Sequence, residues 1–468
     1  MDSLPIQYLH LETAVMPIFL VMVLLVQLAR TTEGTHYITG GRGQWMGLLG
    51  GFMLLTLVFS AFLYNVSLLL AGELAAGFIL SLLHPVNALC FFVQLLFLRP
   101  WEIAATNPLL LALPRVVALL CVFSWLIRPG DHAKPTPRTV QGVLLLLAFS
   151  AWLFLTTFVT PNIAETQGDW FDTYSKSLII FVITVFFIDT ERSLSQFTLT
   201  LVLSALALMV VRYYQYHTEG PSLIRLETGG MFGDPNDLAA VIVMALPFAL
   251  VPAFQKTAPM MYGIIGGLFA AFSVLLIWYS QSRGAMLALT LQLLTAGALF
   301  GARKKWLTLV LLAAVLGAGY VLVLRTISRE SEEMQESSDS RITYWKAAVN
   351  MTLHHPVFGV GFGHYADTYN AYSSGERYEW GKRTAHSSWF LVFAESGLIG
   401  GFLFVSFFLM VFWTAWQNRH LWPDQLLALV GYGVVMSFLS HTYLFYFYLL
   451  SGLILASDSL KESHVDGL

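Results

Sequence analysis

The sequence predicts an all-α, polytopic membrane protein. Hydrophobic residues make up 57% of the 468 residues, and charged residues only 11%, against about 25% in a soluble domain. Apolar runs recur along the chain, and many have the roughly 20 residues that a helix needs to cross a bilayer. The net charge of −3 gives no sign of a nucleic-acid partner. We therefore predict about 13 to 15 membrane-spanning helices and one long loop outside the membrane.

The apolar runs define the predicted elements in chain order. The spans are 12–29, 46–63, 66–83, 108–127, 140–159, 195–212, 236–253, 261–279, 284–301, 306–325, 387–413, 424–440 and 443–456. Two shorter runs, 86–98 and 174–188, are predicted to be tilted or re-entrant. The N-terminus lacks a basic region and a small-residue cleavage site, so we expect no cleaved signal peptide. The predicted parts are N-terminal helices over 1–139, a core over 140–325, the loop 326–386 and C-terminal helices over 387–468.

Basic turns predict the orientation of these helices. The turns 128–138 and 301–306 are rich in Lys and Arg and lie six predicted crossings apart. Because short cytoplasmic loops carry an excess of Lys and Arg, we place both turns in the cytoplasm, together with Arg419. The opposite, outer face then receives the segments 161–172, 213–235, 280–284 and 326–385.

The outer segment 326–385 is the least usual part of the chain, because loops longer than about 15 residues are mostly functional or disordered. It begins with the acidic stretch RESEEMQESSDS, which we expect to be mobile. Helical spacing of apolar residues then predicts an amphipathic helix over 340–354 near the outer membrane surface. Its apolar positions are Ile342, Trp345, Val349 and Leu353. Asp339 or Ser340 is expected to cap it, and the glycines of 359–363 are spaced for a tight turn or a close backbone approach.

Four loops bring a cationic or titratable side chain to the outer face. These side chains are Arg225, Arg283, Arg341 and His386, the last at the entrance to the predicted span 387–413. The simpler interpretation is that each arginine reaches lipid headgroups and that the histidine caps a helix. As a set, however, they suit group transfer from a lipid diphosphate to a hydroxyl. Arginines fit phosphate oxygens, and a histidine can take a proton from a hydroxyl near neutral pH.

A metal-assisted transferase is the chemical alternative, and it would need paired carboxylates. The candidates on the outer face are Asp234, Asp237, Glu165, Asp169 and Asp172. None of them has a specific ligand spacing. Cys90 and Cys121 lie inside apolar runs, so we expect them to be buried as small hydrophobic residues and not paired or bound to metal. The sequence therefore predicts no metal and no other cofactor.

An ordered series of motifs resembles the bacterial O-antigen ligase and O-antigen polymerase superfamily. The motifs are RLETGGMFGDPNDLA, SQSRGA, SRITYWKAAVNMTLHHPVFGVGFGHY and AHSSWFLVFAESGLIGG, and they cover roughly residues 220–412. Each is weak alone, and their order makes the resemblance specific. Two positions depart from the pattern. Ser387 follows His386 where many members have Asn, and the turn at Asp234 reads Asp-Pro-Asn where Asn-Pro-Asn is frequent.

The resemblance implies a C-type, all-helical membrane glycosyltransferase. Proteins of this kind move a glycan from a polyprenyl diphosphate carrier to an acceptor hydroxyl, with inversion and without a metal. By this resemblance Arg283 and Arg341 would bind the donor diphosphate, Arg225 would assist them, and His386 would be the base. The implied location is the bacterial inner membrane, crossed many times, with the active site facing the periplasm.

The acceptor stays open, because the donor chemistry is shared across the superfamily. The extra N-terminal spans slightly favour a polymerase, which adds the glycan to another lipid-linked repeat unit, over a ligase acting on a lipid A core. A protein O-glycan ligase is less favoured because no soluble module follows the last span. A transporter of lipid-linked glycans is an alternative from another class. Transporters often have two related halves, and no paired motifs occur here.

Overall fold

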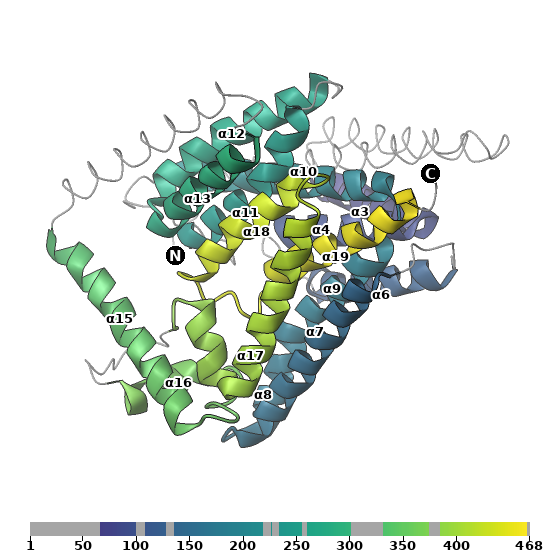
Figure 1. Ribbon diagram of the computed structural model, residues 1–468. Helices are drawn as coiled ribbons and strands as arrows, with labels where there is room; N and C mark the ends of the chain where they lie inside the picture. Colours follow the sequence, from purple (N-terminus) through teal and green to yellow (C-terminus); the bar gives the residue numbers. More distant parts are fainter. Residues whose placement is uncertain are drawn as a thin grey trace, which may run out of the picture. The chain divides into compact units, whose positions relative to one another are not determined.

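The computed structural model describes residues 66–99, 108–127, 135–218, 226, 234–254, 260–300, 331–373 and 384–465. Within these ranges the chain forms helices joined by short turns, without β-strands (Figure 1). Seven of the described helices are long and apolar enough to cross a membrane, and four shorter apolar helices accompany them. The predicted all-α, polytopic fold is confirmed. The predicted spans 12–29, 46–63 and 306–325 lie outside the described residues.

The described residues belong to two compact units, and the first contains residues 186–238, 248–280 and the chain before 134. Its helices are α3 (Val66–Leu83), α4 (Pro85–Leu98), α6 (Pro108–Ile127), α10 (Glu191–Thr218) and α12 (Met260–Ser280). Helix α4 is buried almost throughout and packs against α3, α6 and α10. Its 14 residues are too few to cross a bilayer. The short apolar run at 86–98 is therefore a core helix of this unit.

Polar contacts join α4 to α10 inside this apolar unit. The side chain of Gln196 donates to Asn87 Oδ1 at 2.7 Å, and Asn87 Nδ2 donates to the carbonyl of Leu80 at 3.1 Å. Such hydrogen bonds help to associate helices where lipid offers no competing partner. Cys90 on α4 and Cys121 on α6 are both free and buried, as the sequence predicted.

The second unit contains residues 134–185, 239–247 and 281–468. Its helices are α7 (Pro137–Thr156), η1 (Thr157–Val159), α8 (Ile163–Asp169), η2 (Trp170–Tyr174), α9 (Ser175–Phe187), α13 (Arg283–Phe300), α15 (Ser331–His354), α16 (Tyr365–Tyr372), α17 (Ser388–Gln417), α18 (Pro423–Met436) and α19 (Phe445–Val465), with the middle of α11 (Pro235–Ala253). Helices α7 and α17 lie side by side (Figure 1), and α13 packs along α18. The outer segment expected at 161–172 is largely helical, since Asn162 caps α8.

Helix α17 is broken at Gly397, which has φ +68° and ψ −169°. The chain reverses there, and the ring of Phe393 before the break packs against Gly401 after it. Trp389 lies 5.8 Å from Phe404 and 4.9 Å from Phe408 between ring centroids. The start of α17 therefore lies beside the middle of its longer piece, 398–417. The predicted continuous span 387–413 is wrong in this respect, because glycine permits a backbone conformation that reverses the chain.

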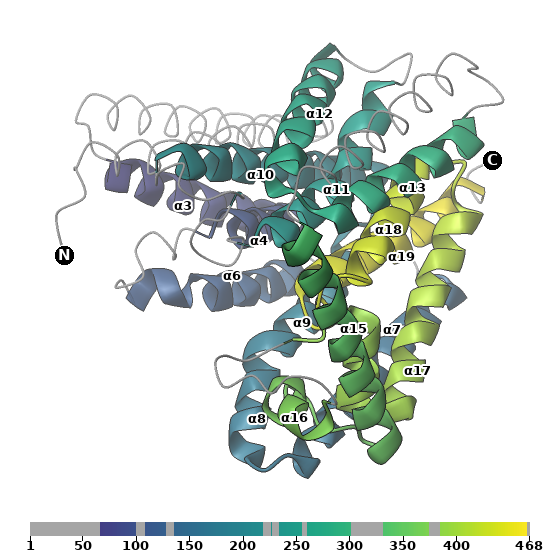
Figure 2. The same cartoon turned by 90° about the vertical axis from the view of Figure 1, so that its left-hand side faces the viewer.

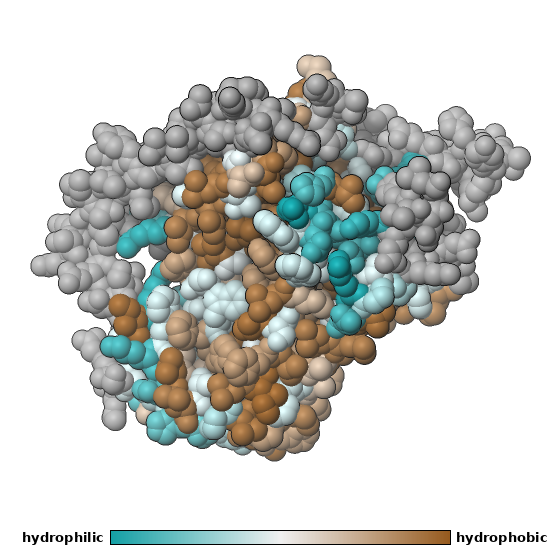
Figure 3. Space-filling model, viewed as in Figure 1, coloured by the Kyte–Doolittle hydropathy of each residue, from teal (hydrophilic) through white to brown (hydrophobic). Residues whose placement is uncertain are grey.

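The longer piece of α17 has an exposed apolar side. Leu398, Phe402, Leu409 and Trp413 are exposed there, and apolar side chains dominate this part of the surface (Figure 3). Its 398–417 stretch is long enough to cross a bilayer alone. The opposite flank packs against α7, where Phe149 and Phe404 lie 5.4 Å apart.

Helix α15 begins earlier than the sequence suggested. It starts at Ser331, so the acidic stretch is helical from that residue and the cap expected at Asp339 or Ser340 is wrong. Its Glu, Met and Gln residues are good helix formers, which explains the extension. The buried face carries Tyr344, Ala347, Ala348 and Met351. The predicted apolar positions Ile342, Val349 and Leu353 are exposed. Helix α16 packs at the C-terminal end of α15 (Figure 2).

In the second unit, a buried carboxylate on α19 joins the start of α7 to the end of α17. Asp458 on α19 accepts hydrogen bonds from Thr136 Oγ1 and Asn418 Nδ2, both at 2.8 Å. Arg138 Nη1 lies 3.8 Å from the same carboxylate. The turn before α7 and the turn after α17 therefore meet, and the sequence had placed both on one face.

Replacing Asp458 with leucine is expected to lower the free energy of unfolding by about 2–4 kcal/mol, because hydrogen bonds to a buried charge are lost and their donors stay buried. Thermal unfolding in detergent micelles measures the change. Asp172→Leu is the matched control, since Asp172 is exposed and its ion pair with Lys176 spans 3.9 Å. Exposed pairs contribute about 0–1 kcal/mol. Equal losses in the two variants would contradict a structural role for the Asp458 cluster.

Candidate active site

Three of the four predicted site residues lie in the second unit. His386 directly precedes the start of α17, is half-buried and has a left-handed φ of 45°. Arg341 lies on α15 and is half-buried, whereas Arg283 is the first residue of α13 and is exposed. Arg225 lies outside the described residues.

Tyr344 contacts His386 and lies one helical turn after Arg341. The tyrosine ring lies 5.8 Å from the imidazole between centroids, with the ring planes 34° apart. Arg341 precedes Tyr344 by three residues, so the two share one side of α15. The next residue, Trp345, stacks on Phe390 of α17 at 5.2 Å. These ring contacts hold α15 against His386 and the start of α17.

The residues after His386 are also held by the turn 437–442. Ser388 Oγ donates to the carbonyl of Leu439 at 2.7 Å and accepts from the amide of His441 at 2.9 Å. Thr442 Oγ1 donates to the carbonyl of Ser388 at 2.9 Å. The start of α17 is therefore fixed by hydrogen bonds as well as by ring packing.

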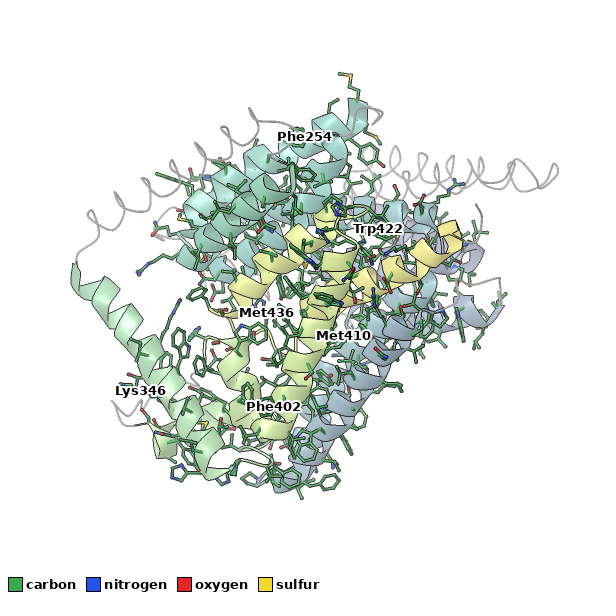
Figure 4. All side chains as sticks on the ribbon, viewed as in Figure 1. Phe254, Lys346, Phe402, Met410, Trp422 and Met436 are labelled. Carbon is green, nitrogen blue, oxygen red and sulfur yellow. The ribbon has the colours of Figure 1, made fainter. Side chains whose placement is uncertain are left out.

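The Ser-Arg-Gly turn that carries Arg283 packs on the same turn. The Ser282 hydroxyl accepts from the amide of Ala285 at 3.3 Å and caps α13. A Cβ atom added to Gly284 would lie 3.2 Å from Phe438 Cδ2. In Figure 4, Lys346 marks α15 and Met436 marks the C-terminal end of α18, just before Phe438. The turn 437–442 thus adjoins both the Arg283 turn and the residues after His386.

The glycine-rich run after α15 forms backbone hydrogen bonds with the residues around the break in α17. The amides of Val360 and Gly361 donate to the carbonyls of Ala394 and Glu395 at 2.8 and 3.1 Å. In return, the amide of Leu398 donates to the carbonyl of Pro356 at 2.8 Å. The broken helix would otherwise leave these groups without partners. A Cβ atom at residue 359 would collide with the Ala394 carbonyl, so the close backbone approach predicted for this run is confirmed.

Sequence reasoning missed three buried residues beside the predicted site. Tyr344 and Tyr365 are buried, and Tyr365 Oη donates to the carbonyl of Tyr344 at 2.8 Å. The carboxylate of Glu395 is 3% exposed and accepts the amide of Tyr365 at 3.0 Å. A lone carboxylate inside an apolar run is a signal of function or of a specific partner, and this signal could have found Glu395.

The carboxylates considered as metal ligands do not form a site among the described residues. Among the described residues, no three His, Cys, Asp or Glu side chains are grouped so that they could hold a metal ion. Asp234 instead caps α11, where its Oδ1 accepts the amide of Asn236 at 2.7 Å. Glu165 accepts a hydrogen bond from the side-chain amide of Asn162 at the start of α8. Metal independence stays a prediction.

Comparison with known proteins places the site in a recognised domain. Residues 65–214 match a family of unknown function (DUF5935), and residues 268–405 match the O-antigen ligase family. No curated protein matches the chain. The second match includes Arg283, Arg341 and His386. Residues 268–405 of this multi-pass membrane protein are therefore an O-antigen ligase domain, and the recognition of the O-antigen ligase and polymerase superfamily from the sequence is confirmed.

Proposed function

We propose that this protein transfers a glycan from a polyprenyl diphosphate carrier to an acceptor hydroxyl, in O-antigen or exopolysaccharide assembly. The reaction would take place at the periplasmic face of the bacterial inner membrane. One observation carries the proposal: the O-antigen ligase domain contains Arg283, Arg341 and His386, and Tyr344, one helical turn after Arg341 on α15, contacts His386. The partners are the lipid-linked glycan donor, a glycan or lipid-linked acceptor, and the bilayer.

In the proposed step, His386 takes the proton of the acceptor hydroxyl as its oxygen attacks the anomeric carbon of the donor sugar. The new glycosidic bond forms while the bond between that carbon and the phosphate oxygen breaks. Attack from the side opposite the leaving group inverts the anomeric centre. The polyprenyl diphosphate leaves with its electron pair, and Arg283 and Arg341 stabilise the added negative charge. Arginine supplies fixed charge and paired donors for this purpose.

The surroundings of the site suit a lipid-borne donor. Trp389, three residues after His386, packs against Phe404 and Phe408 of the longer piece of α17. The outer flank of that piece is apolar and exposed at Phe402 and Leu409. A polyprenyl chain can remain in the bilayer along such a surface while its diphosphate reaches the arginines. We favour a polymerase slightly over a lipid A-core ligase, and we rank protein glycosylation below both.

Donor binding tests the assigned arginines. Arg341→Ala and Arg283→Ala are each expected to raise the Kd for a polyprenyl diphosphate by about 10- to 100-fold, because hydrogen bonds to a charged group contribute about 1.5–3 kcal/mol. Arg341→Lys should keep the charge and lose the paired donors, with an intermediate Kd. Binding is measured by titrating purified protein in lipid nanodiscs.

Arg419→Ala is the control for these variants, because Arg419 bonds to the carbonyl of Trp416 next to the Asp458 cluster. Its Kd should equal that of the natural protein. Unchanged binding in both Arg283→Ala and Arg341→Ala would rule out the proposed diphosphate site.

A further inference from the structure

We propose that Tyr344 is a positioning residue for His386, and that Tyr365 and Glu395 fix Tyr344 in turn. The inference rests on the proposed function, in which His386 takes the acceptor proton. It adds three residues to the machinery, and none of them is required to touch the substrate.

The backbone at His386 needs support from its neighbours. Its φ of 45° is in the left-handed region, which non-glycine residues occupy only where the surrounding structure holds them there. The residue lies outside any helix, between the chain before it and the cap residue Ser387 of α17. The hydrogen bonds of Ser388 fix the chain on the C-terminal side. They leave the direction of the imidazole to side-chain contacts.

Tyr344 supplies such a contact from a different helix. Its ring is 4% exposed and lies 5.8 Å from the imidazole. On another side it meets the ring of Tyr369 at 5.5 Å, which limits the positions that the Tyr344 ring can take. A cation within about 6 Å of an aromatic ring is attracted to its face. The tyrosine ring therefore both orients the imidazole and favours the imidazolium that forms when His386 gains a proton.

Tyr365 and Glu395 connect this ring back to the helix that follows His386. Tyr365 Oη donates to the carbonyl of Tyr344 at 2.8 Å, and burial raises the pKa of Tyr365, so its hydroxyl keeps the proton that it donates. The amide of Tyr365 donates to Glu395 Oε1 at 3.0 Å. The carboxylate lies on α17, nine residues after His386. The contacts thus form a closed circuit from α17 through α16 and α15 to His386.

A double-mutant cycle separates positioning from simple packing. Tyr344→Met removes the ring and keeps much of its volume, and Tyr344→Phe keeps the ring. Both are made in the natural protein and in His386→Ala, and glycan transfer is measured at steady state over a range of concentrations of a polyprenyl-diphosphate-linked repeat unit. Phe181→Leu controls for the loss of a buried ring, since Phe181 is fully buried on α9 against Phe407. Thermal midpoints confirm that each variant is folded.

Tyr344→Met is expected to lower kcat by about 2- to 30-fold, which corresponds to the strength of a cation–ring contact, with donor KM unchanged. Tyr344→Phe should keep the natural rate. In the His386→Ala background, Tyr344→Met should change the residual rate by less than about two-fold, because the two residues act as a unit.

Equal losses from Tyr344→Met in both backgrounds would overturn the inference and leave the proposed function standing. A rise in donor KM that matches the fall in kcat would also overturn the inference. If the His386→Ala background is inactive, this comparison of KM with kcat tests the inference alone. If Tyr344→Met fails to fold, Tyr344→Leu replaces it in the same comparison. A fall in Tyr344→Phe as large as in Tyr344→Met would assign the effect to the hydroxyl and reject positioning by the ring. Absence of glycan transfer by the natural protein would instead overturn the proposed function itself, whereas full activity in His386→Ala would overturn only the assignment of His386 as the base.

Discussion

His386→Ala is expected to reduce glycan transfer by about 10²–10⁴-fold, the usual contribution of a general base. Without the imidazole, nothing assigned to the site takes the proton from the acceptor hydroxyl. Binding of the lipid diphosphate should stay close to that of the natural protein, because the arginines are unchanged. Transfer is measured from the size of the labelled glycan product, and binding from titration in nanodiscs.

His354→Ala is the matched control for this variant. His354 is an exposed histidine at the end of α15, where its Nδ1 lies 2.8 Å from the carbonyl of Asn350. It should transfer glycan at the natural rate. If His386→Ala also transfers at the natural rate, His386 is not the base, and another group must take the proton of the acceptor hydroxyl.

Gly397→Ala is expected to lower the free energy of unfolding by about 2–6 kcal/mol. Its φ of +68° and ψ of −169° fall in a region that is essentially restricted to glycine, and such strain costs about 1–3 kcal/mol. An added Cβ would also overlap the Val357 carbonyl, and overpacking costs a further 1–3 kcal/mol, approximately. The loss is measured by thermal unfolding in micelles.

Gly363→Ala separates these two effects. Gly363 has a φ of +74° in the glycine-rich run after α15, but a Cβ there meets nothing within 4 Å. It should therefore show backbone strain alone, about 1–3 kcal/mol. If Gly397→Ala lowers the free energy of unfolding no more than Gly363→Ala does, the backbone of 356–361 is not closely packed against α17.

Some helix boundaries could be predicted from the sequence because they depend on local signals. The predicted spans 66–83 and 108–127 coincide with α3 and α6, and the predicted end of the loop helix at 354 is the end of α15. Apolar length sets such spans, and proline, as at Pro108, marks helix starts. The acidic start of α15 was mistaken for a mobile segment because its polar composition hid good helix formers.

The reversal of α17 could not be predicted in this way. The run 387–413 is apolar throughout, and glycine is frequent in membrane helices, so Gly397 gives no local sign of a break. Only the amides of Val360 and Gly361, donated from a distant loop, show why the helix can open there. Long-range pairing of this kind leaves no periodic pattern in the sequence.

The charged and titratable residues of the site were easier to predict than the residues that hold them in place. Arginine and histidine stand out in an apolar chain, so Arg283, Arg341 and His386 were identified as candidates and fall within the O-antigen ligase domain. Tyr344 and Tyr365 were not, because a tyrosine in an amphipathic helix reads as ordinary packing. Their role depends on contacts across three helices.

A transfer assay with purified protein tests the central claim most directly. The protein is incubated with a labelled polyprenyl-diphosphate-linked repeat unit and a metal chelator, first without another acceptor and then with a lipid A core. We predict metal-independent transfer that His386→Ala abolishes: lengthening of the lipid-linked glycan identifies a polymerase, and product only with the core identifies a ligase. Absence of any product in both mixtures, from protein that binds the donor, would contradict glycan transfer to a lipid-linked acceptor.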